Sequence, residues 1–367
     1  MLGEVHQLAS QLWMIEGGFV ESQPGLPEAA NALLFQAGDR LYLLDSGMGE
    51  TMRAAIEEQL MTIGRPHDFT LLNTGQGIGG NGNNDIIHNV LADQKNHLTQ
   101  DRLEAGQAQA FSARLYVLSR YVDPFRAVDG NGLRQFGLRA MREVLAAFIG
   151  QRKALRWMVG LAARHWPQMD ESADTAALLL PEDRETLEIG GTTWQGWRLG
   201  EDDVWVLQAG QGLWCYLPAE QVLFAPDWRD AFSPVWPEMQ QKSPTVLWEK
   251  LEQMTREGVI SRLVDGAHAE VIRERGMILQ MVEQLLSRRQ GLQQALEAIL
   301  HREPGMTARQ LSRRLRKLRH RPAVAWYLDE PLPADMICFE QFLVSLLLEM
   351  GCTTRGIWRH KKFFING

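Results

Sequence analysis

The sequence predicts a mixed α/β fold, and three observations lead to this prediction. First, residues 12–15, 30–35 and 41–47 form apolar runs of strand length near the start of the chain. Second, the strand-like run 68–72 leads into a glycine-rich loop, which a helix-like segment follows. Third, further strand-like runs and helices follow after residue 180. Strands and helices that alternate in this way favour sheets covered by helices.

The second group of strand-like runs repeats the pattern. Its strands are expected at residues 185–189, 192–199, 204–207, 213–217 and 222–224. A helix over residues 244–257 and a strand over residues 261–264 come next, and a long helix begins near residue 271. Tryptophans are dense in these strands, and the alternation of side chains predicts that most of them line the core or a cleft wall.

A helical insertion is predicted between the two groups, over about residues 100–170. Its apolar residues recur at mixed three- and four-residue spacings at Leu103, Phe111, Leu115, Leu118 and Val122. The Asp123-Pro124 step and residues 129–132 divide it into pieces. Two interpretations stay open: a lid over a pocket, or helices that pack on the sheets.

Composition indicates a soluble protein of the cytoplasm. The chain has 367 residues and is 45% hydrophobic, which is enough for a large core. We expect no secretory leader, since the first residues lack a basic start and an apolar stretch, and no apolar run reaches bilayer length. Cys215, Cys338 and Cys352 lie far apart with no CxxC pair, which disfavours both disulfides and a cysteine zinc site. We interpret all three as ordinary thiols.

Charge is divided unevenly along the chain. The formal net charge is −7. From residue 300 onward the sequence has 12 Lys and Arg against 6 Asp and Glu, or +6, so the remainder carries −13. The acidic part disfavours a general nucleic-acid surface, whereas the basic tail favours one at the C-terminal end.

The glycine-rich loop over residues 75–82 is the strongest candidate for a binding site. A strand, a tight loop and a helix in this order direct backbone N–H groups at one point. Gly75, Gly77 and Gly80 also match the Gly-x-Gly-x-x-Gly pattern of dinucleotide-binding proteins. The residues that follow, 91–97, are polar and do not form the buried strand which that pattern requires, so we disfavour this interpretation.

Four stretches in the right order resemble the metallo-β-lactamase superfamily. They are residues 41–47 with Asp45-x-Gly47, the loop over 71–85, residues 216–227 ending in Asp227, and residues 263–272 with His268. The resemblance extends over about residues 5 to 290. It implies a four-layer αβ/βα sandwich with a dinuclear zinc site at one edge.

The zinc ligands of that family are largely missing here. Its His-x-His-x-Asp-His ligands fall on Gly75, Gly77, Gly79 and Gly80. A shifted register places Leu72, Thr74, Gln76 and Gly77 there, which also fails. The next histidine position holds Gln208, the bridging position keeps Asp227, and the last one falls on Ala267, with His268 one residue later. Zinc needs nitrogen, sulfur or oxygen ligands and glycine supplies none, so we expect no metal and no cofactor.

The resulting functional prediction is a pseudoenzyme that binds a small ligand in the former active cleft. The ligand-binding candidates are Gly75, Gln76, Gly77, Gly79, Gly80 and Gln208. The alternative is a metal-independent hydrolase, lyase or isomerase. In that alternative the loop N–H groups form an oxyanion hole and Asp227 or His268 acts as the acid–base group. Whether the protein is an enzyme therefore stays open.

A small C-terminal domain, residues 291–367, is predicted to follow the main domain of residues 1–290. Helices at 291–300, 307–316 and 339–350 and a two-stranded wing at 357–365 resemble the winged-helix tail of some family members. The third helix has no Lys or Arg, so base reading is disfavoured. As partners we expect a small ligand and no membrane. A homodimer or interaction module is favoured over nucleic-acid binding for the tail.

Overall fold

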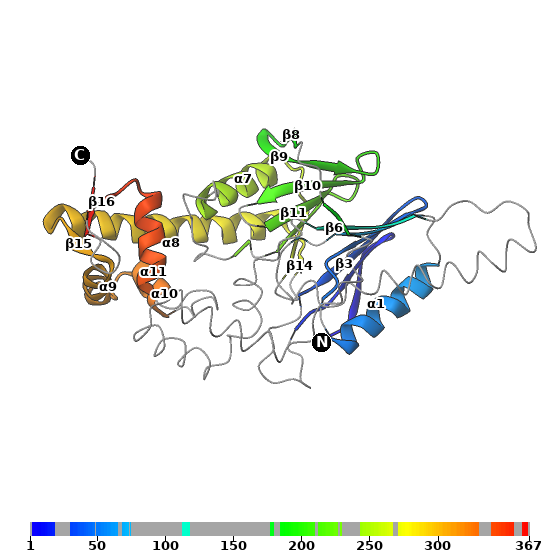
Figure 1. The fold of residues 1–367 in the computed structure, drawn as a ribbon, viewed down its shortest axis with the longest axis horizontal. Helices are drawn as coiled ribbons and strands as arrows, with labels where there is room; N and C mark the ends of the chain where they lie inside the picture. The colour runs from blue at the N-terminus through cyan, green and yellow to red at the C-terminus, as the bar shows by residue number, and fades with distance from the viewer. Residues whose placement is uncertain are drawn as a thin grey trace, which may run out of the picture.

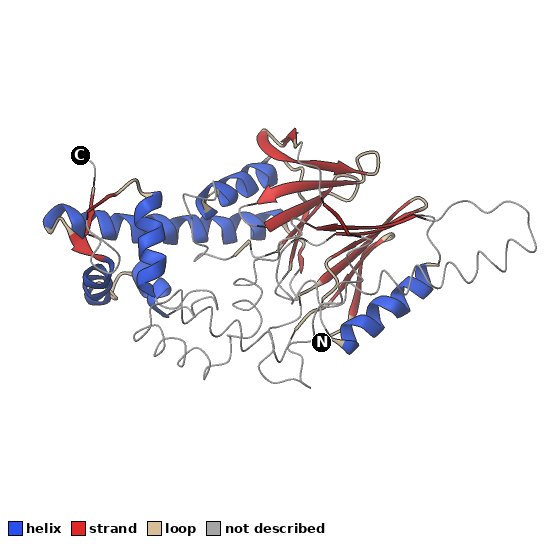
Figure 2. Cartoon of the chain, in the orientation of Figure 1, coloured by secondary structure: helices blue, strands red, loops and turns tan. Residues whose placement is uncertain are grey.

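The computed structural model describes residues 2–18, 30–47, 49–64, 68–72, 74, 112–117, 177–179, 184–209, 212–226, 228–229, 243–266, 271–329, 339–355 and 362–365. Two large sheets, the helices that cover them and a helical C-terminal unit make up this part of the chain (Figures 1 and 2). The mixed α/β class is confirmed.

The first sheet contains seven strands in the order of the sequence. They are β1 (Val5–Ala9), β2 (Leu12–Ile15), β3 (Ala32–Ala37), β4 (Arg40–Leu44), β5 (Asp68–Leu72), β6 (Ser112–Val117) and β7 (Ala177–Leu179). Strands β1 to β4 pair antiparallel, and β4 to β7 pair parallel. Helix α1 (Glu50–Ile63) connects β4 to β5, as a crossover between parallel strands requires.

The second sheet also contains seven strands, in the order β14-β13-β12-β11-β10-β9-β8. They are β8 (Glu185–Ile189), β9 (Thr192–Leu199), β10 (Val204–Ala209), β11 (Gly212–Leu217), β12 (Val222–Ala225), β13 (Arg262–Asp265) and β14 (Val271–Ile272). Only β12 and β13 pair parallel, and helix α7 (Pro244–Arg256) connects them. Strands β8 to β13 follow the predicted runs to within about two residues, whereas β14 was not predicted.

Three hydrophobic clusters define how the layers pack. Alternate side chains of β10 show the principle, since Val206 points toward the first sheet and Leu207 toward the helices on the opposite face. One cluster lies between the sheets, and a second joins the first sheet to α1 through Met52 and Ile56. The third joins the second sheet to α7. Apolar surface buried between layers is the main source of stability in such an arrangement.

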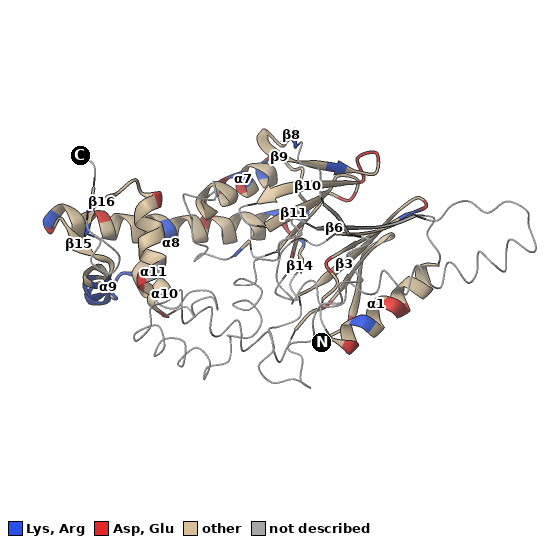
Figure 3. Ribbon diagram, in the orientation of Figure 1, with Lys and Arg blue, Asp and Glu red and all other residues tan. Residues whose placement is uncertain are grey.

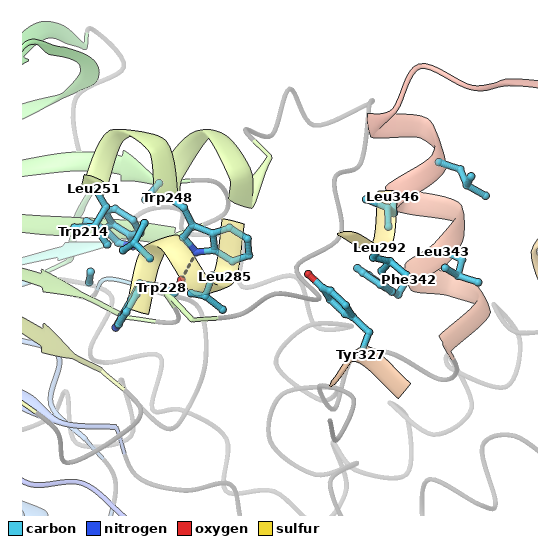
Figure 4. Close-up of a cluster of buried hydrophobic side chains, with 14 of the residues drawn as sticks. Trp214, Trp228, Trp248, Leu251, Leu285, Leu292, Tyr327, Phe342, Leu343 and Leu346 are labelled. Atoms are coloured by element: carbon cyan, nitrogen blue, oxygen red, sulfur yellow. Dashed lines mark hydrogen bonds between the residues drawn. The ribbon is translucent and has the colours of Figure 1, made fainter. Parts of the chain in front are cut away.

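Helix α7 is fixed by a cap at its start and by a buried tryptophan on its inner side. Ser243 caps it by accepting a hydrogen bond from the Thr245 backbone N–H at 3.2 Å, and Pro244 occupies the first turn, where its missing N–H costs nothing. Trp248 is fully buried and donates its indole N–H to the carbonyl of Trp228 at 2.7 Å (Figure 4). This bond satisfies a polar group that would otherwise be stranded in the core.

Helix α8 (Arg275–Arg302) is a single 28-residue helix. Two shorter helices were expected here, with a domain boundary at residue 290, and the first was expected to begin near residue 271. Instead Val271–Ile272 forms strand β14, and α8 continues through residue 290. Apolar residues recur along its whole length, including Ile278, Leu285, Leu292 and Leu300, so its buried face continues past residue 290, with Arg289 as a buried charged residue within it.

The C-terminal unit packs around the second half of α8. It contains β15 (Met306–Thr307), α9 (Ala308–Lys317), α10 (Pro322–Asp329), α11 (Phe339–Glu349), β16 (Thr353–Arg355) and β17 (Lys362–Phe364). Its strands form an antiparallel sheet in the order β15-β17-β16. The side chains of Leu292, Tyr327 and Phe342 belong to the same buried cluster that covers the second sheet (Figure 4).

The predicted helical insertion is wrong over residues 112–117. This segment is strand β6, which pairs parallel to β5 between Asp68↔Ser112 and Leu72↔Tyr116. The apolar residues Ala113, Leu115 and Val117 alternate as in a strand, whereas Phe111, Leu115 and Leu118 have the three- and four-residue spacings of a helix. The pairing with β5 decides in favour of the strand. The other residues of the insertion, 100–111 and 118–170, lie outside the described part. Of the helices described, none has the length and apolar character needed to cross a bilayer.

Candidate functional site

The candidate site lies at the edge of the two sheets where the parallel strands end. Strands β4 and β5 of the first sheet and β12 and β13 of the second run parallel in pairs, so each pair ends at one edge. Asn31 brings these edges together. Its backbone N–H donates to the Gly266 carbonyl at 2.7 Å, and its side-chain Nδ2 donates to the Asp265 carbonyl at 2.5 Å. The carboxyl ends of parallel strands are where α/β proteins usually bind ligands.

Asp45 organises the first-sheet side of this edge. Its carboxylate is buried and accepts two hydrogen bonds from Thr74, one from the backbone N–H at 2.7 Å and one from the hydroxyl at 2.5 Å. Its φ angle is +56°, in the left-handed region that aspartate tolerates better than most residues. The Asp45-x-Gly47 pattern therefore builds a tight turn that holds Thr74.

Thr74 is also fixed to the second sheet. Its carbonyl accepts a hydrogen bond from the Leu213 backbone N–H at 2.7 Å. A Cβ atom on Gly212 would lie 3.2 Å from the same carbonyl, so a small residue suits this position. The residue directly before Gly75 is thus held between the two sheets, and the glycine loop starts from this edge.

Gln208 lies on the inner face of the second sheet, on the same side of β10 as Val204 and Val206. Its Oε1 accepts a hydrogen bond from the Arg184 guanidinium at 2.6 Å. That guanidinium also lies over the Trp197 ring, 5.6 Å from its centroid. The amide that replaces an expected histidine ligand is therefore engaged by a cation of the chain itself.

Asp265 carries the buried carboxylate at the end of β13. The Arg229 Nε lies 3.2 Å from its Oδ2, and the Arg229 side chain is 25% exposed. The same guanidinium stacks on Trp228, 5.1 Å from the ring centroid. Arg229 therefore brings a positive charge to this end of the second sheet and neutralises the charge of Asp265.

The donor groups that the structure describes at this edge are engaged by other groups of the chain. Both oxygens of Asp45 bind Thr74, Asp265 pairs with Arg229, and Gln208 accepts from Arg184. A zinc ligand set needs three or four free donors, and a guanidinium beside a metal ion is repelled by it.

The other predicted site residues lie outside the described residues: Gly75, Gln76, Gly77, Gly79, Gly80, Asp227 and His268. Their neighbours Thr74, Pro226, Trp228 and Gly266 are placed, and a Cβ atom on Gly266 would come within 2.7 Å of Pro226. Of the predicted site residues, Gln208 alone is described. The structure adds Asn31, Arg184 and Arg229, for which the sequence offers no motif.

Cys215 lies behind this edge on the inner face of β11. Burial raises the pKa of its thiol well above the usual range, and the Asp45 carboxylate raises it further. The thiol is therefore protonated and inaccessible. Since the unfolded thiol loses its proton first, the stability that this shift contributes is present below the unfolded pKa and is lost as the pH rises above about 8.5.

We predict that Cys215 resists modification in the folded protein. In a Cys338→Ser variant, a thiol reagent at about pH 8 should label Cys215 only after denaturation, because the reactive thiolate is missing in the native state. Mass spectrometry of the labelled peptides measures this. Rapid labelling of Cys215 in the native protein would contradict the prediction. Labelling of Cys352 has no bearing on the prediction.

A separate group of metal-binding side chains lies on the edge hairpin of β1 and β2. The ligand atoms of Glu4, His6 and Glu16 all lie within 4.8 Å of one another, and His6 Nε2 lies 2.9 Å from Glu16 Oε2. Among the residues that the structure describes, this is the group of three whose donors could hold a metal ion. It has to be controlled for in any measurement of metal content.

Comparison with known proteins gives likenesses to solved structures. No family profile and no curated protein sequence matches this chain. The chain is similar to a metallo-β-lactamase family protein from Thermus thermophilus, with 17% identity, a TM-score of 0.46, and coverage of 98% of this chain and 100% of the other. A β-lactamase domain protein from Burkholderia ambifaria gives 14% identity, a TM-score of 0.49, and coverage of 100% and 94%. A sec-alkyl sulfatase gives 12% identity, a TM-score of 0.45, and coverage of 85% and 45%.

Proposed function

We propose that this chain is a metallo-β-lactamase-fold protein that has lost its zinc centre and binds a small ligand at the edge of its sheets without hydrolysing it. The observation that carries the proposal is the Arg184–Gln208 hydrogen bond at 2.6 Å, formed where the family resemblance implies a histidine ligand. The layers support the scaffold, because α1, the two facing sheets, and α7 with α8 follow the order of a four-layer αβ/βα sandwich.

Two positive side chains mark this edge as a place for an anionic or acceptor-rich ligand. Arg184 is exposed, and a guanidinium has five N–H donors, of which one goes to Gln208. Arg229 contributes a second, part-buried guanidinium. Charge-assisted hydrogen bonds from guanidinium groups are among the stronger ones available for holding a carboxylate or phosphate.

For the C-terminal unit we propose a winged-helix-like module. The strand order β15-β17-β16, with α9 and α11 between β15 and β16 in the chain, supports this assignment. The second predicted strand of the wing coincides with β17, whereas the first strand is formed earlier than expected, by Thr353–Arg355. We retain residue 290 as a formal boundary between the two units, with α8 common to both.

Metal content tests the loss of the zinc centre. We expect the purified, tag-free protein to retain far less than one zinc ion per chain after incubation with zinc and dialysis, because glycines occupy the first four ligand positions. Elemental analysis measures it. A His6→Ala variant removes the contribution of the edge hairpin.

Stoichiometric zinc that survives His6→Ala but is lost in Asp227→Asn would overturn the proposal. The same pair of substitutions separates a binder from an enzyme. If the protein turns over a substrate without metal, Asp227→Asn and His268→Ala should abolish turnover; in a binder they change affinity alone.

Ligand binding is tested at Arg184. A thermal-shift screen of small carboxylates and phosphates would supply a probe, and Arg184→Ala should weaken its binding by about tenfold or more, the loss of one charge-assisted hydrogen bond. Arg198→Ala is the matched control, since Arg198 is also exposed on this sheet and stacks on Trp205 at 4.8 Å. Equal losses in both variants would exclude a specific role for Arg184.

A further inference from the structure

Helix α9 concentrates positive charge on one face. Thr307 caps it together with Gln310 in a reciprocal capping box, and Leu311 and Leu315 bury its opposite side. Arg309, Arg313, Arg316 and Lys317 are all exposed. Positions spaced by four, seven and eight residues share one side of a helix, so these four side chains form a single surface, here named the α9 basic face.

The α9 basic face has no acidic partner among the residues that the structure describes. The neighbouring arginines differ, because Arg314 pairs with Glu303 at 2.7 Å and Arg319 pairs with Asp329. Figure 3 shows Lys and Arg residues gathered on α9, whereas α7 and α8 carry residues of both signs. An uncompensated cluster of this kind repels itself, and it gains most from an anionic partner.

Two more cations continue this surface at the start of α9. In the register of the small sheet, Lys362 of β17 lies opposite Thr307, the cap of the helix, and Arg355 of β16 lies opposite Lys362. Both side chains are exposed. Two further exposed cations therefore lie on strands beside the N-terminal end of α9.

We propose that the α9 basic face binds the sugar–phosphate backbone of a nucleic acid. From Arg309 to Lys317 the helix rises about 12 Å, at about 1.5 Å per residue. One DNA strand carries a phosphate about every 3.4 Å of axis, so this length faces about three or four phosphates. Four cations therefore meet a matching number of charges.

A membrane surface is disfavoured as the partner. An amphipathic helix that binds a bilayer inserts its apolar side chains between the lipids. The apolar residues Ala308, Leu311 and Leu315 are buried in the protein core instead. Among the residues described, the exposed large hydrophobic side chains are Val5, Met61, Val246 and Met277, and none of these lies on α9 or the adjacent sheet.

The binding proposed here differs from that of a helix-turn-helix module, in which the third helix enters a groove of the DNA and reads the bases. Helix α11 holds that position, but Phe342, Leu343, Leu346 and Leu347 are fully buried. At its end Glu349 accepts hydrogen bonds from Arg289 and from Ser243 at the start of α7. Since α11 cannot enter a groove, contacts from α9 reach phosphates and not base edges, and we infer binding without sequence preference.

Fluorescence anisotropy with the full chain tests this proposal. The probes are single-stranded DNA, RNA and duplex DNA of one sequence, each about 20 nucleotides long, which exceeds a usual single-module site. Neutralising four phosphates predicts that log K falls with log salt concentration at a slope of about −3. The triple variant Arg313→Gln, Arg316→Gln and Lys317→Gln should reduce the slope to about −1 and weaken binding at low salt at least tenfold.

A control variant with the same change in net charge tests whether binding depends on the α9 basic face or only on the overall charge of the protein. Arg198→Gln, Arg256→Gln and Arg273→Gln remove three exposed cations outside the C-terminal unit, and binding should stay unchanged. Melting temperatures confirm that both variants fold. Equal loss in the two variants, or no salt-dependent binding of any probe, would overturn the proposal. So would binding to phosphatidylserine vesicles alone, which would assign the face to a membrane.

Discussion

Replacing Asp45 with alanine should lower the free energy of unfolding by about 3–5 kcal/mol, which is among the largest effects expected from a single polar side chain. The carboxylate accepts both hydrogen bonds from Thr74, and Thr74 is itself buried. Without Asp45, the Thr74 N–H and hydroxyl lose these partners inside the protein. Alanine also fits poorly at a φ angle of +56°, which adds about 1 kcal/mol.

Two other variants identify the source of this loss. Asp45→Asn keeps the side-chain oxygen and the tolerance for positive φ, so it should cost about half as much. Asp202→Ala has the same backbone strain, with φ of +76°, at an exposed site. Chemical denaturation followed by tryptophan fluorescence measures all three. If Asp45→Ala and Asp202→Ala cost the same, the hydrogen bonds to Thr74 contribute nothing and the account of this edge is wrong.

The second large effect is expected at Arg289, where replacement by methionine should cost about 3–5 kcal/mol. The Arg289 side chain is 1% exposed and pairs with Glu349, whose side chain is 12% exposed. The guanidinium also lies over the Phe342 ring, 5.3 Å from its centroid. Removal of the cation leaves a carboxylate with little water around it, which the hydroxyl groups of Ser243 and Thr245 still contact.

A double-variant cycle checks that the two charges are coupled. Arg289→Met with Glu349→Leu removes both charges, and we expect it to recover most of the stability lost in the single variant. Arg256→Met, which breaks an exposed pair with Glu252, is the surface control and should have little effect. Strictly additive losses for Arg289→Met and Glu349→Leu would show that the pair does not act as a unit.

The sequence predicted the buried strands well, because continuous apolar runs such as those of β4 and β11 have few alternatives to a sheet. Strand β1 was missed, since most of its residues are not buried and its place depends on pairing with β2. Strand β6 was mistaken for a helix for the related reason that its partner β5 lies some forty positions earlier. The two helices expected on either side of residue 290 form the single helix α8, because its largely apolar buried face continues across that position.

The sequence predicts where the residues of the candidate site lie along the strands, but not which side chains they contact. Asp45 and Gln208 each lie at the end of a recognisable strand. The partners that decide its chemistry come from elsewhere. Arg184 reaches Gln208 across 24 positions, and Asn31 reaches Asp265 across 234. No local pattern encodes such contacts, since tertiary packing alone brings these residues together.

The contacts of Asn31 also set an order of events during synthesis. The residue leaves the ribosome early, but its partners Asp265 and Gly266 follow more than two hundred positions later. At roughly 5–20 residues per second, the first half of the chain waits about 10–50 s for them. Until strands β8 to β12 have emerged, the inner face of the first sheet, with Leu33, Phe35 and Leu44, has no second sheet to cover it. The nascent protein is therefore at its most aggregation-prone in the earlier part of that interval, and a chaperone that shields this face would act then.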